Sequence, residues 1–339
     1  MSQRLPVIHA GLNKTGTTSL QRLLFARHPE VAFLGKYPLG KRNPAEGRYL
    51  THGMGEFLDD VIGFEPGVEW ERLQQTGVAY TPDCPEMWRR QFAAHIQPFL
   101  DEERVPVWSL ERLCLGSPRV REVRALRIAQ AFGPCKVVMV LREPLALVES
   151  LYFQRLKAAQ LRDPATSQTG RYLSISDWLE DCWEGEQRDV LGIVDYGRTI
   201  QWFVDLFGRD NVGVFLFEDL VGQPETFLSE LCAFCGIDSE QAYALMQNTR
   251  KNVRWTEESI ARLRWIDRIP AAPYLFRKAP KARRARWLGV DRKHALSGSR
   301  ARAEIPAEWA ARISDACRSS NHFLRDEWGL ALDRHGYPL

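Results

Sequence analysis

Short apolar runs alternate with longer amphipathic segments along most of the chain. Runs bounded by Gly, Pro or polar residues predict five β-strands, at residues 5–10, 31–34, 105–110, 136–141 and 212–217. The run KVVMVL at 136–141 is apolar toward both faces, which is typical of a central parallel strand covered by helices on both sides. Residues 38–67 are rich in Gly, Pro and charge, and predict an irregular excursion.

The amphipathic segments between and after these runs have apolar residues at helical spacing. They predict helices from Thr17 onward and at 88–100, 117–132, 145–157, 176–183, 198–207, 219–235, 239–246, 256–267 and 307–326. Strands that alternate with helices indicate an α/β fold, a three-layer sandwich with a mostly parallel central sheet and right-handed crossovers.

The number of predicted strands decides the domain organisation. A chain of 339 residues has room for two domains of about 150 residues each. Five strands spread over about 215 residues are too few for two such sheets. We therefore expect a single domain over residues 1–339, with an α/β core and inserted loops at 5–235 and a helical, basic part at 236–339.

Composition excludes several classes of protein. Hydrophobic residues make up 45% and charged residues 26% of the chain, which is ordinary globular usage and not that of a disordered or collagen-like chain. A net charge of +3 is too balanced to indicate binding to nucleic acid. Residues 277–302 nevertheless hold ten Lys and Arg against one acid. This segment either attracts an anionic acceptor such as a polysaccharide, the nucleotide itself or a membrane surface, or is a solvated helix face.

Cysteine usage and hydropathy bear on the compartment. No run approaches the roughly 18 apolar residues that span a bilayer, and the N-terminus lacks the features of a signal peptide. The seven scattered cysteines, an odd number, favour reduced thiols in the cytoplasm. Cys232 and Cys235 lie on a predicted amphipathic helix without a second pair, so we interpret them as buried helix residues and expect no metal site.

The strongest chemical signal is the loop GLNKTGTTS at residues 11–19. A strand that enters a Gly-bearing loop and then a helix directs several backbone N–H groups at one point, which binds phosphate or sulfate. The spacing of Gly11 and Gly16 is that of a nucleotide-binding P-loop. However, Thr17 occupies the position of the usual lysine, the only lysine is Lys14, and no acidic strand end follows to hold magnesium.

The segment GLNKTGTTSLQ resembles the 5′-phosphosulfate-binding loop of sulfotransferases that use 3′-phosphoadenosine 5′-phosphosulfate (PAPS). The resemblance implies a P-loop-like sulfotransferase fold with PAPS as co-substrate and no metal. It also implies that Lys14 stabilises the leaving phosphate oxygen. The 5′-phosphate would be held by the other residues of the loop, Thr15, Gly16, Thr17, Thr18 and Ser19.

A second element follows the strand KVVMVL. Arg142 stands at the carboxyl end of this strand, where open parallel sheets bind ligands, and its planar guanidinium can grip a phosphate in bidentate fashion. Ser150 follows eight residues later on a predicted helix. The pair resembles the 3′-phosphate-binding element of the same family. Arg250 and Lys251 resemble the late Arg-Lys pair of its cytosolic branch, and are otherwise a solvated charged turn.

A third element, the segment VGVFLFEDL at 212–220, also resembles a strand end of the family. We interpret its residues Glu218 and Asp219 as capping and turn residues.

A general base must also accept the proton that leaves the acceptor. In the cytosolic branch a histidine ends the strand equivalent to 105–110, whereas this chain has Glu111 just after it. Other branches of the family use a glutamate as base, so the resemblance implies Glu111 as the first candidate for the catalytic base; the alternative is a structural salt bridge to Arg112 or Arg119. Lys36 and His52 are further candidates near the acceptor, and either can be an ordinary surface residue. His9 lies inside the first predicted strand and is expected in the core.

The resemblance is to bacterial sulfotransferases of carbohydrate or cell-surface type. It implies transfer of a sulfuryl group to a hydroxyl, or less readily an amine, of a carbohydrate or glycolipid. Two alternatives stay open at this point. One is a P-loop kinase or nucleoside triphosphatase, and the other is a non-catalytic module that binds anions or glycans.

Overall fold

A computed structural model describes residues 4–35, 85–114, 118–161, 169–183, 190–247, 255–290 and 298–339. The chain divides into two compact units. Unit 1 comprises Met1–Glu143, Glu186–Thr249 and Asp315–Leu339, and unit 2 comprises Pro144–Gly185 and Arg250–Ser314. The single domain expected over 1–339 stays a prediction.

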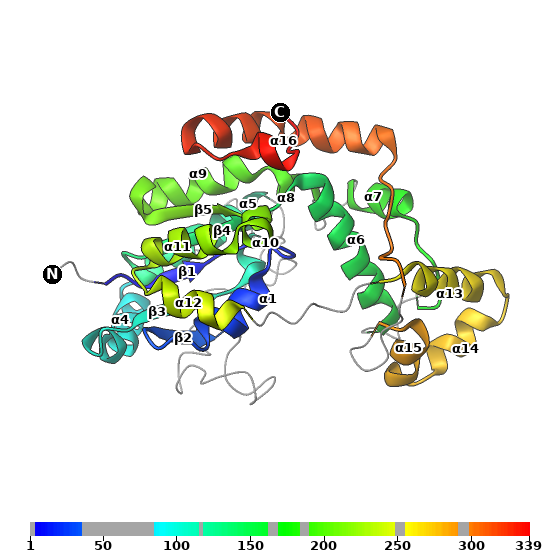
Figure 1. Cartoon of the computed structure of the whole chain (residues 1–339), viewed down its shortest axis with the longest axis horizontal. Helices are drawn as coiled ribbons and strands as arrows, with labels where there is room; N and C mark the ends of the chain where they lie inside the picture. The colour runs from blue at the N-terminus through cyan, green and yellow to red at the C-terminus, as the bar shows by residue number, and fades with distance from the viewer. Residues whose placement is uncertain are drawn as a thin grey trace. The chain divides into compact units, whose positions relative to one another are not determined.

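Unit 1 is built on one sheet of five strands, shown in Figure 1. The strands are β1 (Val7–His9), β2 (Val31–Gly35), β3 (Val105–Ser109), β4 (Lys136–Leu141) and β5 (Val212–Leu216). Their order is β2-β3-β1-β4-β5, and each pair of neighbours is parallel. The predicted α/β fold with a mostly parallel central sheet is confirmed, and the predicted strands agree with these bounds to within two residues.

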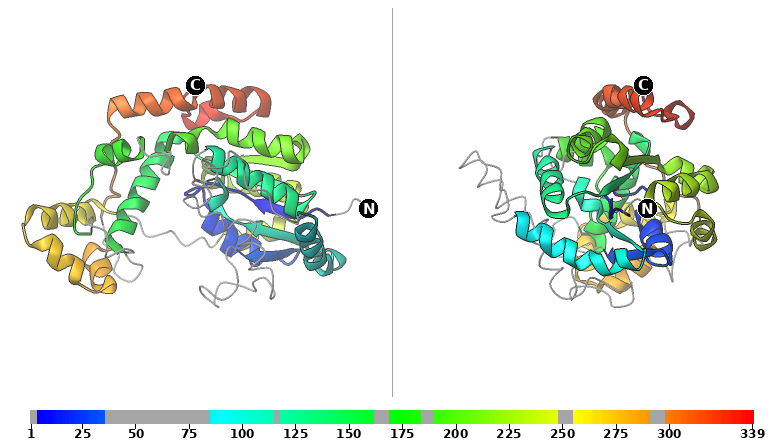
Figure 2. Two further views of the ribbon diagram at one scale, coloured as in Figure 1. Left: turned by 180° about the vertical axis from the view of Figure 1, so that it is seen from behind. Right: turned by 90° about the vertical axis from the view of Figure 1, so that its left-hand side faces the viewer.

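Helices cover both faces of this sheet, as the right-hand view of Figure 2 shows. The helices of the α/β core are α1 (Thr17–Ser19), its π-helical continuation η1 (Leu20–Phe25), α4 (Pro85–Asp101), α5 (Pro118–Phe132), α8 (Val190–Val194), α9 (Tyr196–Phe207), α10 (Phe217–Gly222), α11 (Pro224–Cys235) and α12 (Ser239–Met246). One core joins strand residues such as Val105 and Val138 to η1, α11 and α12. On the other face Trp108 stacks on Phe132 of α5, with ring centroids 5.3 Å apart.

The helix expected at 219–235 is wrong in one respect, because the structure has two helices there. α10 ends before Gln223, and α11 begins at Pro224. The proline ring disfavours helical dihedrals in the preceding residue, and Gln223 accordingly has φ −138° and ψ 59°. Cys232 and Cys235 lie buried in α11, as expected.

Unit 2 is helical in its described part. Its helices include α6 (Pro144–Leu161), α7 (Ile175–Trp183), α13 (Glu257–Arg268), α14 (Ala272–Lys278) and α15 (Lys281–Leu288). A further helix, α16 (Ala307–Trp328), passes from unit 2 into unit 1. The helical C-terminal part expected from the sequence is confirmed. Over the residues described, no helix has the length and apolarity needed to cross a bilayer.

Candidate active site

The strand order places a topological switch point at the carboxyl ends of β1 and β4. β1 leads to β2 on one side of the sheet, while its neighbour β4 leads to β5 on the other side. The connections of two adjacent strands therefore diverge, which leaves room for a ligand at this edge. The loop at residues 11–19 follows β1, and Arg142 follows β4. The loop at residues 11–19 and Arg142 thus lie at the carboxyl end of the same sheet.

The backbone of the loop is shaped to hold an anion. Lys14 and Gly16 have left-handed φ values of 70° and 80°. Within the described residues, the N–H groups of Asn13, Thr15 and Gly16 donate to no main-chain carbonyl. Alternation of left-handed and ordinary residues makes successive N–H groups converge into an anion-binding concavity. These donors suit a phosphate without any side chain.

Replacement of Gly16 by a residue with a side chain would strain the loop. A Cβ atom built there would lie 2.7 Å from Cδ2 of Leu220 on α10, and the positive φ disfavours other residues as well. α10 therefore packs directly against the loop, and this close approach depends on glycine.

The threonine hydroxyls divide into two groups. Thr15 and Thr17 are buried, and both donate to the carbonyl of Leu12, at 2.7 and 3.0 Å. Thr18 is exposed, as is Lys14, and Ser19 is half-buried. The sequence suggested a Thr17 hydroxyl that donates to the anion, whereas in this structure the hydroxyl closes the loop upon itself. The Thr17 hydroxyl is thus bonded within the loop, while the Thr18 side chain is exposed.

Arg142 contacts the loop at residues 11–19 directly. Its Nη1 donates to the carbonyl of Lys14 at 3.0 Å, and its guanidinium lies 4.9 Å from the ring centroid of Phe217, the first residue of α10. The guanidinium is therefore held between the loop and the helix after β5. Phe217 was not identified from the sequence as part of the site; its place directly after an apolar strand was the available signal.

The turn that carries Arg142 is fixed by residues from distant parts of unit 1. The hydroxyl of Tyr196 donates to the carbonyl of Arg142 at 2.6 Å. Glu218 accepts from the N–H of Glu143 at 2.9 Å and from the hydroxyl of Tyr337 at 3.1 Å. Burial raises the pKa of both tyrosines well above its usual value, so both phenols remain donors.

Asp219 makes a similar contact with the C-terminal tail. Its Oδ1 lies 2.9 Å from Nε2 of His335, in the 3₁₀ turn η5 (Leu332–His335). The structural role expected of Glu218 and Asp219 agrees with these contacts. No pattern in the sequence pointed to Tyr337 or His335, because a single Tyr and a single His near a chain end have no distinctive spacing.

Behind the loop lies a buried polar group. His9 is in the core of β1, as expected, with Nδ1 2.7 Å from Oγ of Ser109 at the end of β3. Gln21 of η1 donates to the same Oγ at 2.9 Å. The thiol of Cys114 donates to the carbonyl of Ala10 at 2.8 Å, and burial raises its pKa to about 12. These bonds tie the ends of β1 and β3 to the base of the loop.

Of the remaining candidates, the described residues include Ser150 and the backbone of Glu111. Glu111 begins the 3₁₀ turn η3 (Glu111–Cys114) after β3, the strand that pairs with β1, so its backbone is at the same sheet edge as the loop. Its side chain lies outside the described part. Ser150 is half-buried on α6 in unit 2. Lys36, His52, Arg250 and Lys251 also lie outside the described residues. In the part that is described, no group of three or more His, Cys, Asp or Glu side chains gathers to hold a metal.

The fold is an α/β fold with a parallel sheet, and a Gly-bearing loop follows its first strand. A family model described as a sulfotransferase domain matches residues 5–259, about three quarters of the chain. The chain therefore belongs to the sulfotransferase domain family and is an enzyme that transfers sulfuryl groups. This membership replaces the two alternatives left open by the sequence, the nucleoside triphosphatase and the non-catalytic module. Sulfotransferases of this family use PAPS as donor.

Similar solved structures are themselves sulfotransferases. The sulfotransferase of Alicyclobacillus acidocaldarius is 18% identical, with 70% of this chain and 83% of that chain covered and a TM-score of 0.42. The sulfotransferase domain of the olefin synthase of Synechococcus PCC 7002 is also 18% identical, with 94% and 96% covered and a TM-score of 0.41. A mouse sulfotransferase complexed with PAP is 12% identical, with 74% and 65% covered and a TM-score of 0.38. No curated protein matches the sequence.

Proposed function

We propose that this enzyme moves a sulfuryl group from PAPS to a hydroxyl of a carbohydrate or glycolipid, with an amine as the less favoured acceptor. The observation that carries the proposal is the hydrogen bond from Arg142 to the carbonyl of Lys14. It brings together, at one end of the sheet, a loop suited to a 5′-phosphate and an arginine suited to a second phosphate. The donor carries both of these groups on one nucleotide.

The loop would hold the 5′ end of the donor. The N–H groups of Thr15 and Gly16, with those of Thr17 and Thr18 at the start of α1, supply donors that are positioned before the ligand arrives. The hydroxyls of Thr18 and Ser19 stand in the same turn, while Thr15 and Thr17 keep the loop closed through the Leu12 carbonyl.

The 3′-phosphate would be bound by Arg142. Its planar fork suits a phosphate, and its contacts with Lys14 and Phe217 fix its orientation before binding. Ser150, Arg250 and Lys251 remain proposed partners of the same phosphate, on the resemblance to the family.

The chemistry requires one cation and one base. The S–O bond to the 5′-phosphate breaks as a new bond forms to the acceptor oxygen, so negative charge gathers on the oxygen that is left behind. Lys14, exposed at the turn of the loop, would stabilise that charge. Glu111, just beyond β3, would take the acceptor's proton, so that the products are the sulfated acceptor and adenosine 3′,5′-bisphosphate.

A carbohydrate or glycolipid acceptor is proposed on the resemblance to bacterial enzymes of that type. The eleven tryptophans and nine tyrosines of the chain provide aromatic faces on which sugar rings can stack. The acceptor is tested by incubating the enzyme with radiolabelled PAPS and a panel of sugars, glycolipids, amino sugars and phenols. Label in a sugar hydroxyl supports the proposal, whereas label only in phenols contradicts it.

The donor is tested separately by thermal shift. We expect adenosine 3′,5′-bisphosphate to raise the unfolding temperature without magnesium, because the two phosphate sites are built from the chain's own groups. Stabilisation by ATP with magnesium and none by the bisphosphate would contradict the donor site.

A further inference from the structure

Unit 2 has an uncharged tip that is flanked in the sequence by cations. The tip consists of residues 269–276, which connect α13 to α14 and continue through most of α14; none of its eight residues is charged. Tyr274 and Leu275 are 55% and 64% exposed, and the neighbouring Trp265 on α13 is 59% exposed. Three large apolar side chains at this level of exposure on neighbouring helices indicate a surface that contacts another phase or molecule.

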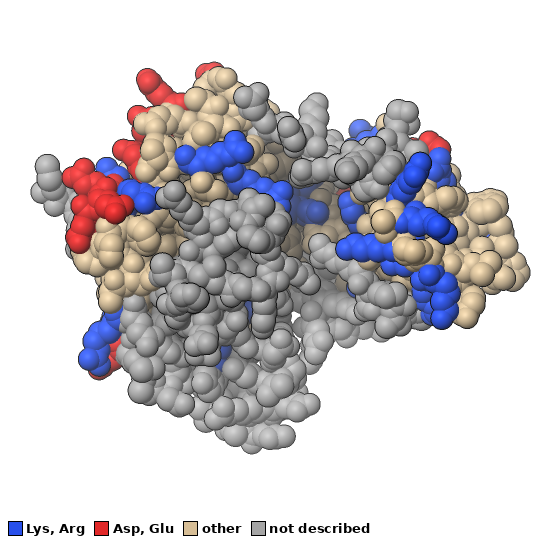
Figure 3. Space-filling view, turned by 90° about the horizontal axis from the view of Figure 1, so that it is seen from below, with Lys and Arg blue, Asp and Glu red and all other residues tan. Residues whose placement is uncertain are grey.

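The cations around the tip far outnumber the acids. Residues 264–286 contain eight Lys and Arg and one acid, Asp267, which is itself paired with Arg171 at 3.3 Å. Six of these cations are exposed: Arg264, Arg268, Lys278, Lys281, Arg283 and Arg286. Figure 3 shows Lys and Arg side chains gathered beside an uncharged surface over this part of the molecule. The apolar tip therefore lies in a region of positive electrostatic potential.

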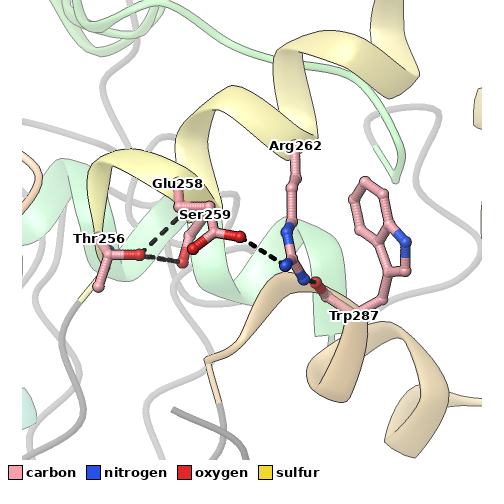
Figure 4. A network of polar contacts seen from close by, with 5 residues as sticks. All are labelled: Thr256, Glu258, Ser259, Arg262 and Trp287. Atoms are coloured by element: carbon pink, nitrogen blue, oxygen red, sulfur yellow. Dashed lines mark hydrogen bonds and ion pairs between the residues drawn. The ribbon is translucent and has the colours of Figure 1, made fainter. Parts of the chain in front are cut away.

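The helices that carry the tip are held in a fixed arrangement. Figure 4 shows the start of α13, where Thr256 and Ser259 form a capping box. One turn later Arg262 pairs with Glu258 at 2.6 Å and also donates to the carbonyl of Trp287 on α15. Arg262 thus joins two helices of the unit and is not one of the six exposed cations.

A second arginine fixes the helix at the tip itself. Arg284 is buried, and it donates to the carbonyl of Gln160 at 2.9 Å and to that of Arg277 at the end of α14 at 3.2 Å. Gly170 lies against Pro273, so closely that a Cβ atom would be 2.7 Å from the Cα of the proline. The exposure of the tip is therefore a property of an anchored helix rather than of a loose chain end.

We propose that the tip at 269–276 and the exposed Lys and Arg residues of 264–286 form a docking surface for a bilayer that contains anionic lipid. Tyr274, Leu275 and Trp265 would enter the headgroup region, where amphipathic aromatic rings are favoured. Lys278, Lys281 and the arginines would remain at the level of the phosphates. This inference does not depend on the donor or the acceptor proposed above.

The apolar centre of the surface favours a bilayer over an anionic polysaccharide. A sulfated or carboxylated polysaccharide contacts cations and stacks on aromatic rings, but it gains little from Leu275 or from the apolar turn that includes Pro270 and Ala271, both exposed. A bilayer uses both features, because apolar side chains enter the hydrocarbon boundary while cations meet the lipid phosphates.

The proposal is tested by sedimenting the full-length protein with phosphatidylcholine vesicles that contain or lack phosphatidylglycerol, at low and high salt. We expect binding to the anionic vesicles only, weakened by salt. Leu275→Glu and the double variant Lys278→Glu/Lys281→Glu should each weaken binding by about tenfold or more. The control Arg90→Glu/Arg318→Glu makes the same change in net charge at exposed positions on α4 and α16, and should bind like the wild type.

A site-specific label reports insertion directly. An environment-sensitive fluorophore on Leu275→Cys should shift to shorter wavelength with anionic vesicles, whereas the same label on Val221→Cys, 67% exposed on α10, should not. Equal thermal unfolding temperatures show that the variants are folded. The proposal is overturned if the wild type ignores anionic vesicles, if the Leu275 and lysine variants bind as well as it does, or if it binds an immobilised anionic polysaccharide and no vesicles.

Discussion

Lys14 adopts a backbone conformation that few residues other than glycine adopt. Its φ of 70° places it in the left-handed region, which costs a residue with a Cβ about 1 kcal/mol or more. Its carbonyl accepts from Arg142, so the same conformation that exposes the side chain also connects the loop to the second phosphate element. Strain of this kind is characteristic of functional sites.

Removal of the Lys14 side chain should affect turnover more than binding. We expect Lys14→Ala to lower kcat by about two to three orders of magnitude, because a preorganised charge at the leaving oxygen is lost. The measurement is initial rate at saturating radiolabelled donor. Arg90→Ala, which removes an exposed cation from α4, is the matched control and should retain full turnover. A kcat that Lys14→Ala leaves intact would remove this residue from the chemistry.

Replacement of Arg142 should affect binding of the donor first. Arg142→Ala is expected to weaken the affinity for adenosine 3′,5′-bisphosphate by ~2–4 kcal/mol, because a bidentate charged contact is lost together with the link to Lys14. Titration calorimetry measures this directly. Arg142→Lys keeps the charge but not the planar fork, and should recover only part of the affinity. Unchanged affinity in both variants would place the 3′-phosphate elsewhere.

At the scale of elements, the C-terminal tail is part of the support of the site. η5 and Tyr337 contact the residues that follow β5, and one of these, Glu218, caps the N–H of Glu143 beside Arg142. The tail lies beyond residues 5–259 that match the family model. A short segment outside the matched region therefore positions an arginine within it.

Tyr337→Phe removes one hydroxyl and leaves the ring in place. The Glu218 carboxylate loses the hydrogen bond that it accepts from this hydroxyl. A hydrogen bond to a charged group is worth about 1.5–3 kcal/mol, and we expect part of that loss to appear as looser positioning of Arg142. We predict a severalfold higher KM for the donor and a nearly unchanged kcat. The control is Arg334→Ala, an exposed neighbour in η5. A fall in kcat at constant KM would show that the tail acts on the chemistry and not through donor binding.

The sheet was predictable because each strand is a short apolar run between polar turns. Both bounds of β4 (Lys136–Leu141) were predicted, because its apolar run follows Pro134 and Cys135 and ends at Arg142. α14 and α15 were not predicted, because α14 is only seven residues long and contains a proline, while half of the eight residues of α15 are Lys or Arg, so neither segment shows a helical apolar period. The break between α10 and α11 is indicated in the sequence by Pro224.

The site was predictable only where one local segment contains the chemistry. The loop around Lys14 and the strand end at Arg142 are such segments. By contrast, other contacts form only once the chain has folded. They are the hydrogen bond between Arg142 and Lys14, the one from Thr17 to Leu12 and the one from Tyr337 to Glu218. Long-range side-chain contacts of this kind leave no periodic trace in a single sequence.

At the scale of the whole molecule, buried groups that must stay neutral occur in both units. Tyr196 and Tyr337 in unit 1 and Tyr152 in unit 2 are buried, and burial raises the pKa of each above the usual value of 10.0. Burial also raises the pKa of the Cys114 thiol from 9.0 to about 12. Each of these groups keeps its proton in the folded protein at a pH where the unfolded chain has lost it.

Stability should therefore fall as the pH rises through this range. Below about pH 8 these phenols and thiols are protonated in both states and contribute no pH dependence. Above about pH 9 for the thiol and about pH 10 for the tyrosines, the unfolded state binds fewer protons, so the free energy of unfolding decreases by up to ~1.4 kcal/mol per pH unit for each group. Urea unfolding at a series of alkaline pH values measures the slope. Tyr337→Phe should lower the slope by about one group, and an unaltered slope in that variant would show that the Tyr337 phenol ionises as readily in the folded protein as in the unfolded chain.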